Sequence, residues 1–328
     1  MNSAVNLGRA RPAFDAWRFV GRYGALLVLL LMIAVLTALQ PGTFATADNA
    51  INVLNQSALT AVIAIGLTFP LAAGEFDLSI GYTASLAGVV ACSLMADSGA
   101  PIPAAFAVAV AVGALVGLVN GLVVTVLRVN ALVATLGVGT VVIGANYAIS
   151  GGVPITVQRQ ADSFIDLTLG TFLGIPHPVY VMAAVAGGMW VLLNRTVPGQ
   201  SMQAVGGNSV AARLSGIRVE RVRVTVYAIS GVCAAVTGVL LASRTGSAAV
   251  NGGDGYLLSA FSAVFFGSAV MRDGQFHIVG TLVGVVTVAV GYNAIALIGL
   301  ATYWQYLFQG TLLILGVGVG SLARRRAG

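Results

Sequence analysis

Residues 102–127 read IPAAFAVAVAVGALVGLVNGLVVTVL, which is 26 consecutive positions without a charged side chain. A helix of about 20 apolar residues is long enough to cross the hydrocarbon core of a bilayer. Comparable apolar stretches recur from Tyr23 to Leu322, with only short polar breaks between them. Hydrophobic residues make up 58% of the 328-residue chain and charged residues 8%, whereas soluble domains carry about 25% charged residues. The sequence therefore predicts an all-α, polytopic integral membrane protein.

The polar breaks divide the chain into ten expected membrane spans. These spans are Tyr23–Leu39, Val53–Ala72, Ile80–Met95, Ile102–Leu127, Ala131–Ile149, Pro178–Leu193, Val224–Ala242, Leu257–Val270, Phe276–Leu297 and Tyr303–Val319. Together they form one transmembrane domain over residues 23–322, between cytoplasmic tails at residues 1–22 and 323–328.

The arginines give the expected orientation of these spans. The chain has 16 basic residues, all of them arginine. With a cytoplasmic N-terminus, ten spans place 14 of the 16 on the cytoplasmic side and leave only Arg159 and Arg244 outside. Because cytoplasmic loops are enriched in positive charge, this distribution supports an even number of spans with both termini in the cytoplasm. Eight or twelve spans would keep the same ends.

The densest charged segment runs from Gly206 to Arg223, inside a cytoplasmic loop expected over residues 195–223. Four arginines and one glutamate fall within its last eleven residues. Asn208 is a favourable helix N-cap, and Gly216 is a favourable position for the helix to end. The sequence therefore predicts a short polar helix between two spans, where a membrane protein would contact a soluble partner.

No pattern in the chain indicates catalysis or metal binding. The two histidines, His177 and His277, are far apart in sequence and have no ligand spacing. A P-loop needs a lysine on the nucleotide phosphates, and the chain contains none. We therefore expect no enzymatic activity, no metal and no bound cofactor, so that any ATP must be hydrolysed by another polypeptide. The net charge of +6 lies in short loops, which indicates membrane topology and not nucleic-acid binding.

Four polar side chains are candidates for a gate or a solute pathway. Glu75 and Asp77 lie between the second and third spans, and carboxylates held at membrane depth usually pair or mark a pathway. Their alternative role is a capped turn at the interface. Asn146 and Asn293 lie within spans, where an amide exchanges hydrogen bonds with a polyol hydroxyl or bridges two helices.

A faint internal repeat is also present. Residues 74–79 loosely resemble residues 253–259, and each segment precedes a short apolar run that contains glycine. Inverted repeats with interrupted helices are typical of transporters. In the ten-span topology the two segments are expected on opposite sides of the membrane.

Several short motifs resemble those of one family, the permease subunits of bacterial ABC importers for ribose, xylose, arabinose and autoinducer-2. The matching segments, in family order, are Gly74–Gly81 (G-x-x-D-L-S-x-G), Asn120-Gly121, Ala134–Gly137, Gly206–Asn208 with Ala211-Ala212 and Ser215–Ile217, Ser230-Gly231, Gly255-Tyr256 and Gly280-Thr281. The resemblance covers residues 52–318. Residues 266–274 depart from the pattern, because two glycines of the family's G-G-x-S-x-x-G-G stretch are missing.

The resemblance implies an ABC importer permease fold with inverted repeats in the bacterial inner membrane. It implies an ATPase subunit that binds ATP inside, a periplasmic binding protein outside, and a second permease that is either identical or a paralogue. The residues implied to form the coupling helix that contacts the ATPase are Gly206, Gly207, Asn208, Ala211, Ala212 and Gly216. The implied function is ATP-driven import of a monosaccharide or related polyol. The alternatives are an ion-coupled secondary transporter using Glu75 or Asp77, and a membrane scaffold or receptor.

Overall fold

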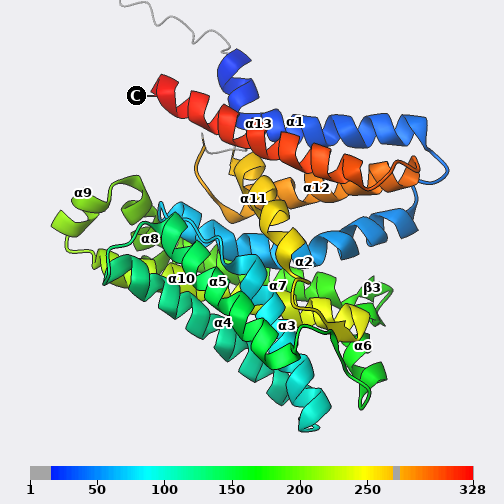
Figure 1. Cartoon of the computed structure of the whole chain (residues 1–328). Coiled ribbons are helices and arrows are strands. Elements are labelled where there is room, and N and C mark those ends of the chain that lie inside the picture. The colour runs from blue at the N-terminus through cyan, green and yellow to red at the C-terminus, as the bar shows by residue number, and fades with distance from the viewer. Residues whose placement is uncertain (1–15, 269–273, 328) are drawn as a thin grey trace, which may run out of the picture.

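The computed structural model describes residues 16–268 and 274–327, which fold into a bundle of helices (Figure 1). The helices of the described part are α1 (Ala16–Leu39), α2 (Ala47–Ala72), α3 (Ile80–Asp97), α4 (Ile102–Thr125), α5 (Ala131–Ser150), α6 (Ala161–Leu169), α7 (His177–Arg195), α8 (Val197–Gly207), α9 (Ser209–Leu214), α10 (Val219–Thr245), α11 (Asp254–Ser268), α12 (Ile278–Leu297) and α13 (Tyr303–Ala327).

Each of the ten expected spans overlaps one of these helices, and the last two residues of the span Leu257–Val270 lie outside the described residues. Within the described residues, seven helices have the length and apolar composition of a membrane span, namely α2, α3, α4, α5, α7, α10 and α12. The prediction of a polytopic helical membrane protein is therefore confirmed, while the count of ten spans stays a prediction. Helix α2 begins earlier than expected, because its polar first turn is stabilised by a cap. Thr46 accepts a hydrogen bond from the N–H of Asn49 at the start of α2.

Helix α10 lies at the centre of the bundle, and its closest neighbour is α4. Gly113, Gly117 and Gly121 are spaced four residues apart and form one face of α4. A Cβ atom added at Gly117 would overlap the backbone carbonyl of Tyr227 on α10. Small residues allow helix backbones to touch in a membrane, where close packing and not water exclusion drives association.

The ends of the bundle carry different elements. In Figure 1, α9 and the C-terminal end of α13 lie at the left, and α6 and β3 lie at the right. Two short antiparallel pairs also occur, β1 (Ile155–Thr156) with β4 (Ser247–Ala248) and β2 (Thr171–Phe172) with β3 (Ile175–Pro176). The β1–β4 pair joins the segment between the fifth and sixth expected spans to the segment between the seventh and eighth, and the ten-span topology places both of these segments outside. This separation of the ends agrees with the predicted topology.

The N-terminal ends of helices α3 and α11 meet inside the bundle. The 18-residue α3 follows a non-helical segment over residues 73–79, and α11 has 15 residues. The N–H of Gly253 donates to Oγ of Ser85 over 2.9 Å. The membrane sides of residues 74–79 and 253–259 stay a prediction, because Gly74 adjoins Gly206 on α8 whereas Gly253 meets Ser85 farther along α3. Hydropathy assigns the polar residues before Tyr256 to an outer loop, and the structure buries only Gly253 among residues 251–255.

Candidate functional site

The predicted polar helix is present as α9, and its cap is the expected one. Oδ1 of Asn208 accepts hydrogen bonds from the N–H groups of Val210 and Ala211, each over 3.0 Å. Gly216 follows the end of α9 with a φ of 85°, a left-handed conformation that favours glycine. Asn208 thus separates α8 from α9 at a sharp turn, and the turn presents α9 at the end of the molecule (Figure 1).

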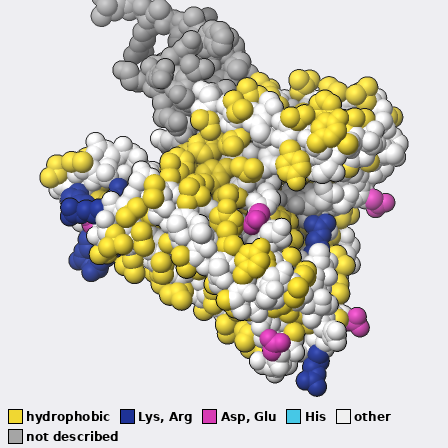
Figure 2. Space-filling view, in the orientation of Figure 1, with side chains coloured by type: hydrophobic (Ala, Val, Ile, Leu, Met, Phe, Trp, Pro, Cys, Tyr) yellow, Lys and Arg dark blue, Asp and Glu magenta, His cyan; other side chains and the backbone are white. Residues whose placement is uncertain are grey.

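The surface of α8 and α9 combines exposed apolar side chains with basic ones. Leu214 is 85% exposed and Val197 is 77% exposed. Figure 2 shows basic side chains gathered at this end of the molecule, and the exposed arginines of the segment are Arg213, Arg218 and Arg221. Exposed apolar residues with a polar rim are typical of a protein–protein contact. Among the predicted site residues, Gly207, Asn208, Ala211 and Gly216 are exposed here, and Ala212 is buried against Val205 and Val219.

Gly206 connects this surface to the membrane-embedded part of the chain. A Cβ atom added at Gly206 would overlap the carbonyl oxygen of Ala72, the last residue of α2. A Cβ atom at Gly74 would lie 3.7 Å from Cα of Gly206. The C-terminal end of α8 therefore touches the point where α2 gives way to the non-helical segment 73–79. This direct contact could not be foreseen from the sequence.

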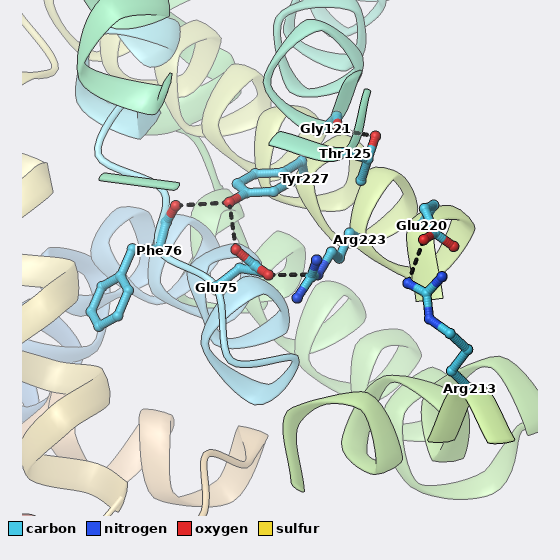
Figure 3. Close-up of polar contacts among 8 residues, drawn as sticks. All are labelled: Glu75, Phe76, Gly121, Thr125, Arg213, Glu220, Arg223 and Tyr227. Atoms are coloured by element: carbon cyan, nitrogen blue, oxygen red, sulfur yellow. Dashed lines mark hydrogen bonds and ion pairs between the residues drawn. The ribbon is translucent and has the colours of Figure 1, made fainter. Parts of the chain in front are cut away.

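Glu75, in this non-helical segment, pairs with the first turns of α10. Its Oε1 lies 2.6 Å from Nε of Arg223, and the hydroxyl of Tyr227 donates to the carbonyl oxygen of Phe76 over 3.1 Å (Figure 3). The Arg223–Glu75 contact is an ion pair and not an aligned hydrogen bond, since the Arg223 Nε proton meets no acceptor in the described part of the chain. Burial raises the pKa of Glu75, and the Arg223 guanidinium opposes this shift.

Asp77 is 1% exposed and is held by neutral donors. It accepts hydrogen bonds from Oγ of Ser79 (2.6 Å), from the N–H of Ser79 (3.0 Å) and from Oγ of Ser230 on α10 (2.7 Å). Nδ2 of Asn120 on α4 donates to the same Ser79 hydroxyl over 2.7 Å. Thr135 on α5 accepts from the N–H of Leu78. Three helices thus fix this segment, and each carboxylate already has partners within the chain.

The two asparagine candidates lie elsewhere and differ from each other. Asn293 on α12 forms a reciprocal amide pair with Asn49 on α2, with donor–acceptor distances of 2.8 and 3.1 Å. This is the helix-bridging role. Asn146 on α5 is 0% exposed, and neither of its amide atoms has a hydrogen-bond partner among the described residues. Neither side chain is bonded to the segment 73–79. Within residues 16–268 and 274–327, no group of three or more metal-ligating side chains is found.

Comparison with known proteins places the chain in a family. The family model described as the permease component of branched-chain amino acid transport systems matches residues 49–317. The chain belongs to this permease family. It is 35% identical to the ribose import permease protein RbsC of Escherichia coli (strain K12) over 297 residues, which cover 89% of this chain and 91% of the relative. No solved structure was found to match.

Two further relatives of the permease are named for other sugars. The L-arabinose ABC transporter permease protein AraH of Azospirillum brasilense is 34% identical over 97% of this chain and 96% of its own length. The galactose/methyl galactoside import permease protein MglC of Escherichia coli (strain K12) is 34% identical over 92% of this chain and 95% of its own length.

The sequence motifs of the permease meet in space. Asn120, Thr135 and Ser230 belong to three separate motifs, and all of them contact the segment 77–79 or a residue that holds it. Their position in the motifs was the only signal that they belong together. Arg223 and Tyr227 carried no such signal, because an arginine in a cytoplasmic loop and a tyrosine in a span are both common. The structure adds these two residues to the site.

The ion pair between Arg223 and Glu75 gives a stability prediction. Arg223→Gln leaves the Glu75 carboxylate buried without a cation, and we expect the free energy of unfolding to fall by about 2 kcal/mol. The double variant Glu75→Gln/Arg223→Gln should recover part of this loss. The measurement is thermal unfolding of the purified permease in detergent.

The matched control is a second arginine pair in the same segment. Arg213 and Glu220 form an ion pair in which both side chains are exposed, and exposed pairs contribute little to stability. Arg213→Gln should therefore leave the unfolding midpoint unchanged. A double variant at Glu75 and Arg223 that is no more stable than Arg223→Gln alone would contradict the proposed role of the pair.

Proposed function

We propose that the permease is the membrane-spanning subunit of an ATP-driven importer for a monosaccharide or related polyol. The observation that carries the proposal is the surface of α8 and α9, which is capped at Asn208 and exposes both apolar and basic side chains. Such a surface suits a soluble ATPase that docks at the inner membrane face. The relatives named for ribose, L-arabinose and galactose support a neutral sugar as the solute.

The proposal includes partners on both sides of the bacterial inner membrane. The ATPase subunit binds and hydrolyses ATP on the cytoplasmic side, and a periplasmic binding protein delivers the sugar on the other. A second permease, either an identical copy or a paralogue, completes the passage. Gly206, Gly207, Asn208, Ala211, Ala212 and Gly216 are the residues proposed to seat in the ATPase.

The contacts of Gly206 support a route by which ATPase closure reaches the membrane. Movement of α9 is passed to α8, and the C-terminal end of α8 abuts Ala72 and Gly74. The segment 73–79 then moves relative to α10, to which Glu75 and Asp77 bind. Coupling of this kind requires that ATP and sugar bind the inward-facing and outward-facing states with different affinities.

The ion-coupled alternative is less well supported. A coupling carboxylate has to exchange an ion with water during each cycle, whereas Asp77 is buried among three hydrogen-bond donors and Glu75 is paired with Arg223. These contacts fit the capped turn that was the other interpretation of the two acids. Pathway roles for Glu75, Asp77, Asn146 and Asn293 stay predictions, and the reciprocal pair with Asn49 favours helix bridging for Asn293.

Reconstitution tests the proposed function directly. Vesicles that contain the permease, its ATPase and its binding protein should accumulate the sugar only when ATP is supplied inside the vesicle, where the ATPase subunit lies. A protonophore should not change the rate, since no ion gradient is used. Vesicles with the permease alone should show no uphill uptake. Uphill uptake by the permease alone, abolished by the protonophore, would contradict the proposal and favour the ion-coupled transporter.

A further inference from the structure

Asp254, the first residue of α11, lies next to the N-terminal end of α3 and not at an end of the bundle. Its neighbour Gly253 is buried, donates to Oγ of Ser85 over 2.9 Å, and has its carbonyl oxygen in contact with Gly81. Both partners lie in the first two turns of α3. The start of α11 is therefore held at the same depth as the start of α3.

This depth lies within the membrane spans. Tyr256, two residues after Asp254, packs on the cluster formed by Ala58, Leu59 and Leu240. Leu59 is the midpoint of α2, and α10 continues past Leu240 to Thr245. Helix α11 thus begins inside the bilayer.

Asp254 is nevertheless exposed on the surface of the single chain. The next residue, Gly255, is also exposed, and a Cβ atom added there would meet no atom within 4 Å. In the residues that the structure describes, the Asp254 side chain makes no hydrogen bond and no ion pair. A carboxylate that faces lipid is costly, and acids at membrane depth face a water-filled cavity or a partner. This part of the surface is therefore not covered by lipid in the working assembly.

We propose that Asp254 lines the solute passage and accepts hydrogen bonds from the hydroxyl groups of the passing sugar. An ionised carboxylate offers only acceptors, and a sugar offers several hydroxyl donors at short spacing. Hydrogen bonds to a charged acceptor are stronger than those to a neutral one. The start of α11 leaves room beside the carboxylate, because the following residue is glycine. This inference deepens the proposed import function and rests on it.

Thiol labelling tests whether Asp254 faces water. The complete importer carrying Asp254→Cys is treated with the membrane-impermeant cation 2-(trimethylammonium)ethyl methanethiosulfonate. We expect fast labelling at position 254, while unmodified importer gives the background from Cys92 and Cys233, which are buried. Val108→Cys on α4 is the control, because Val108 is exposed at a similar depth among apolar neighbours. A lipid-facing thiol at that position should not react.

Transport tests whether Asp254 contacts the sugar. Uptake of D-ribose, L-arabinose and D-galactose is measured with reconstituted wild type and variants. Asp254→Leu should lower the maximal uptake rate by about tenfold or more, and Asp254→Asn by less, since an amide still bonds to hydroxyls. The amount of ATPase subunit that copurifies should not change. If Asp254→Leu fails to assemble, the uptake rate of Asp254→Asn and the labelling of Asp254→Cys decide whether Asp254 lines the passage.

Either of two results would overturn the inference. One is absence of labelling at position 254, as expected if lipid or a second permease covers the side chain. The other is an uptake rate for Asp254→Leu equal to that of wild type. Both results leave import by the wild-type assembly intact, so they are distinct from failure of the proposed function. If the proposed function itself were wrong, the wild-type assembly would import none of the three sugars.

Discussion

A permease carrying Ala211→Glu is expected to insert in the membrane and fold, yet to lose ATP-driven uptake by about a hundredfold or more. Ala211 is exposed on α9, and its side chain makes no contribution to the buried cluster that Ala212 joins with Val205 and Val219. A glutamate there would be desolvated without a partner when the ATPase docks, and an unpaired buried charge costs several kcal/mol. Sugar uptake and copurification of the ATPase are the two measurements.

The matched substitution at this position is Ala211→Ser, which adds one hydroxyl and no charge. It should keep most of the uptake and most of the bound ATPase. Gly207→Arg, at a second exposed position of the same surface, should behave like Ala211→Glu because its side chain would project into the interface. Normal uptake by Ala211→Glu at normal expression would remove α9 from the proposed coupling route.

Gly117→Leu should have the largest effect on folding. The glycine lies against the backbone carbonyl of Tyr227, so any Cβ atom forces α4 away from α10. Overpacking of a well-packed interior costs about 1–3 kcal/mol even without backbone overlap. We expect Gly117→Leu to lower the free energy of unfolding by about 3 kcal/mol or more. The expected observation is a lower yield of folded permease in detergent and a lower unfolding temperature.

Gly144→Ala on α5 is the control for this substitution. A Cβ atom at Gly144 would meet no atom within 4 Å, so the variant should unfold at or above the wild-type temperature. Alanine also favours helix over glycine by about 1 kcal/mol. If Gly117→Leu were as stable as wild type, the close contact between α4 and α10 would be disproved.

The membrane spans were predictable because each of them is a long uninterrupted apolar run. Their limits were less predictable, since α2 and α10 begin with polar turns that hydropathy assigns to loops. The start of α11 was misplaced for the same reason. Its polar residues resemble an outer loop, and only the contact between Gly253 and Ser85 shows that Gly253 enters the bundle.

The site was predictable in part. The cap at Asn208 follows from local sequence, because a capping side chain bonds to N–H groups two or three residues away. The partners of Glu75 and Asp77 do not, because Arg223 and Ser230 follow them by about 150 positions. No periodicity connects residues that are so far apart in the chain. Their pairing depends on how α10 is placed against the segment 73–79, which is a property of the tertiary structure.

The glycine face of α4 limits how the permease can change shape. Two helices whose backbones touch at Gly113, Gly117 and Gly121 cannot slide past each other without first coming apart. Helices α4 and α10 are therefore expected to travel as a single rigid body throughout the transport cycle. The bending that switches the permease between its inward-facing and outward-facing states is then expected in backbone that lacks helical hydrogen bonds. These segments are chiefly residues 73–79 and 249–253.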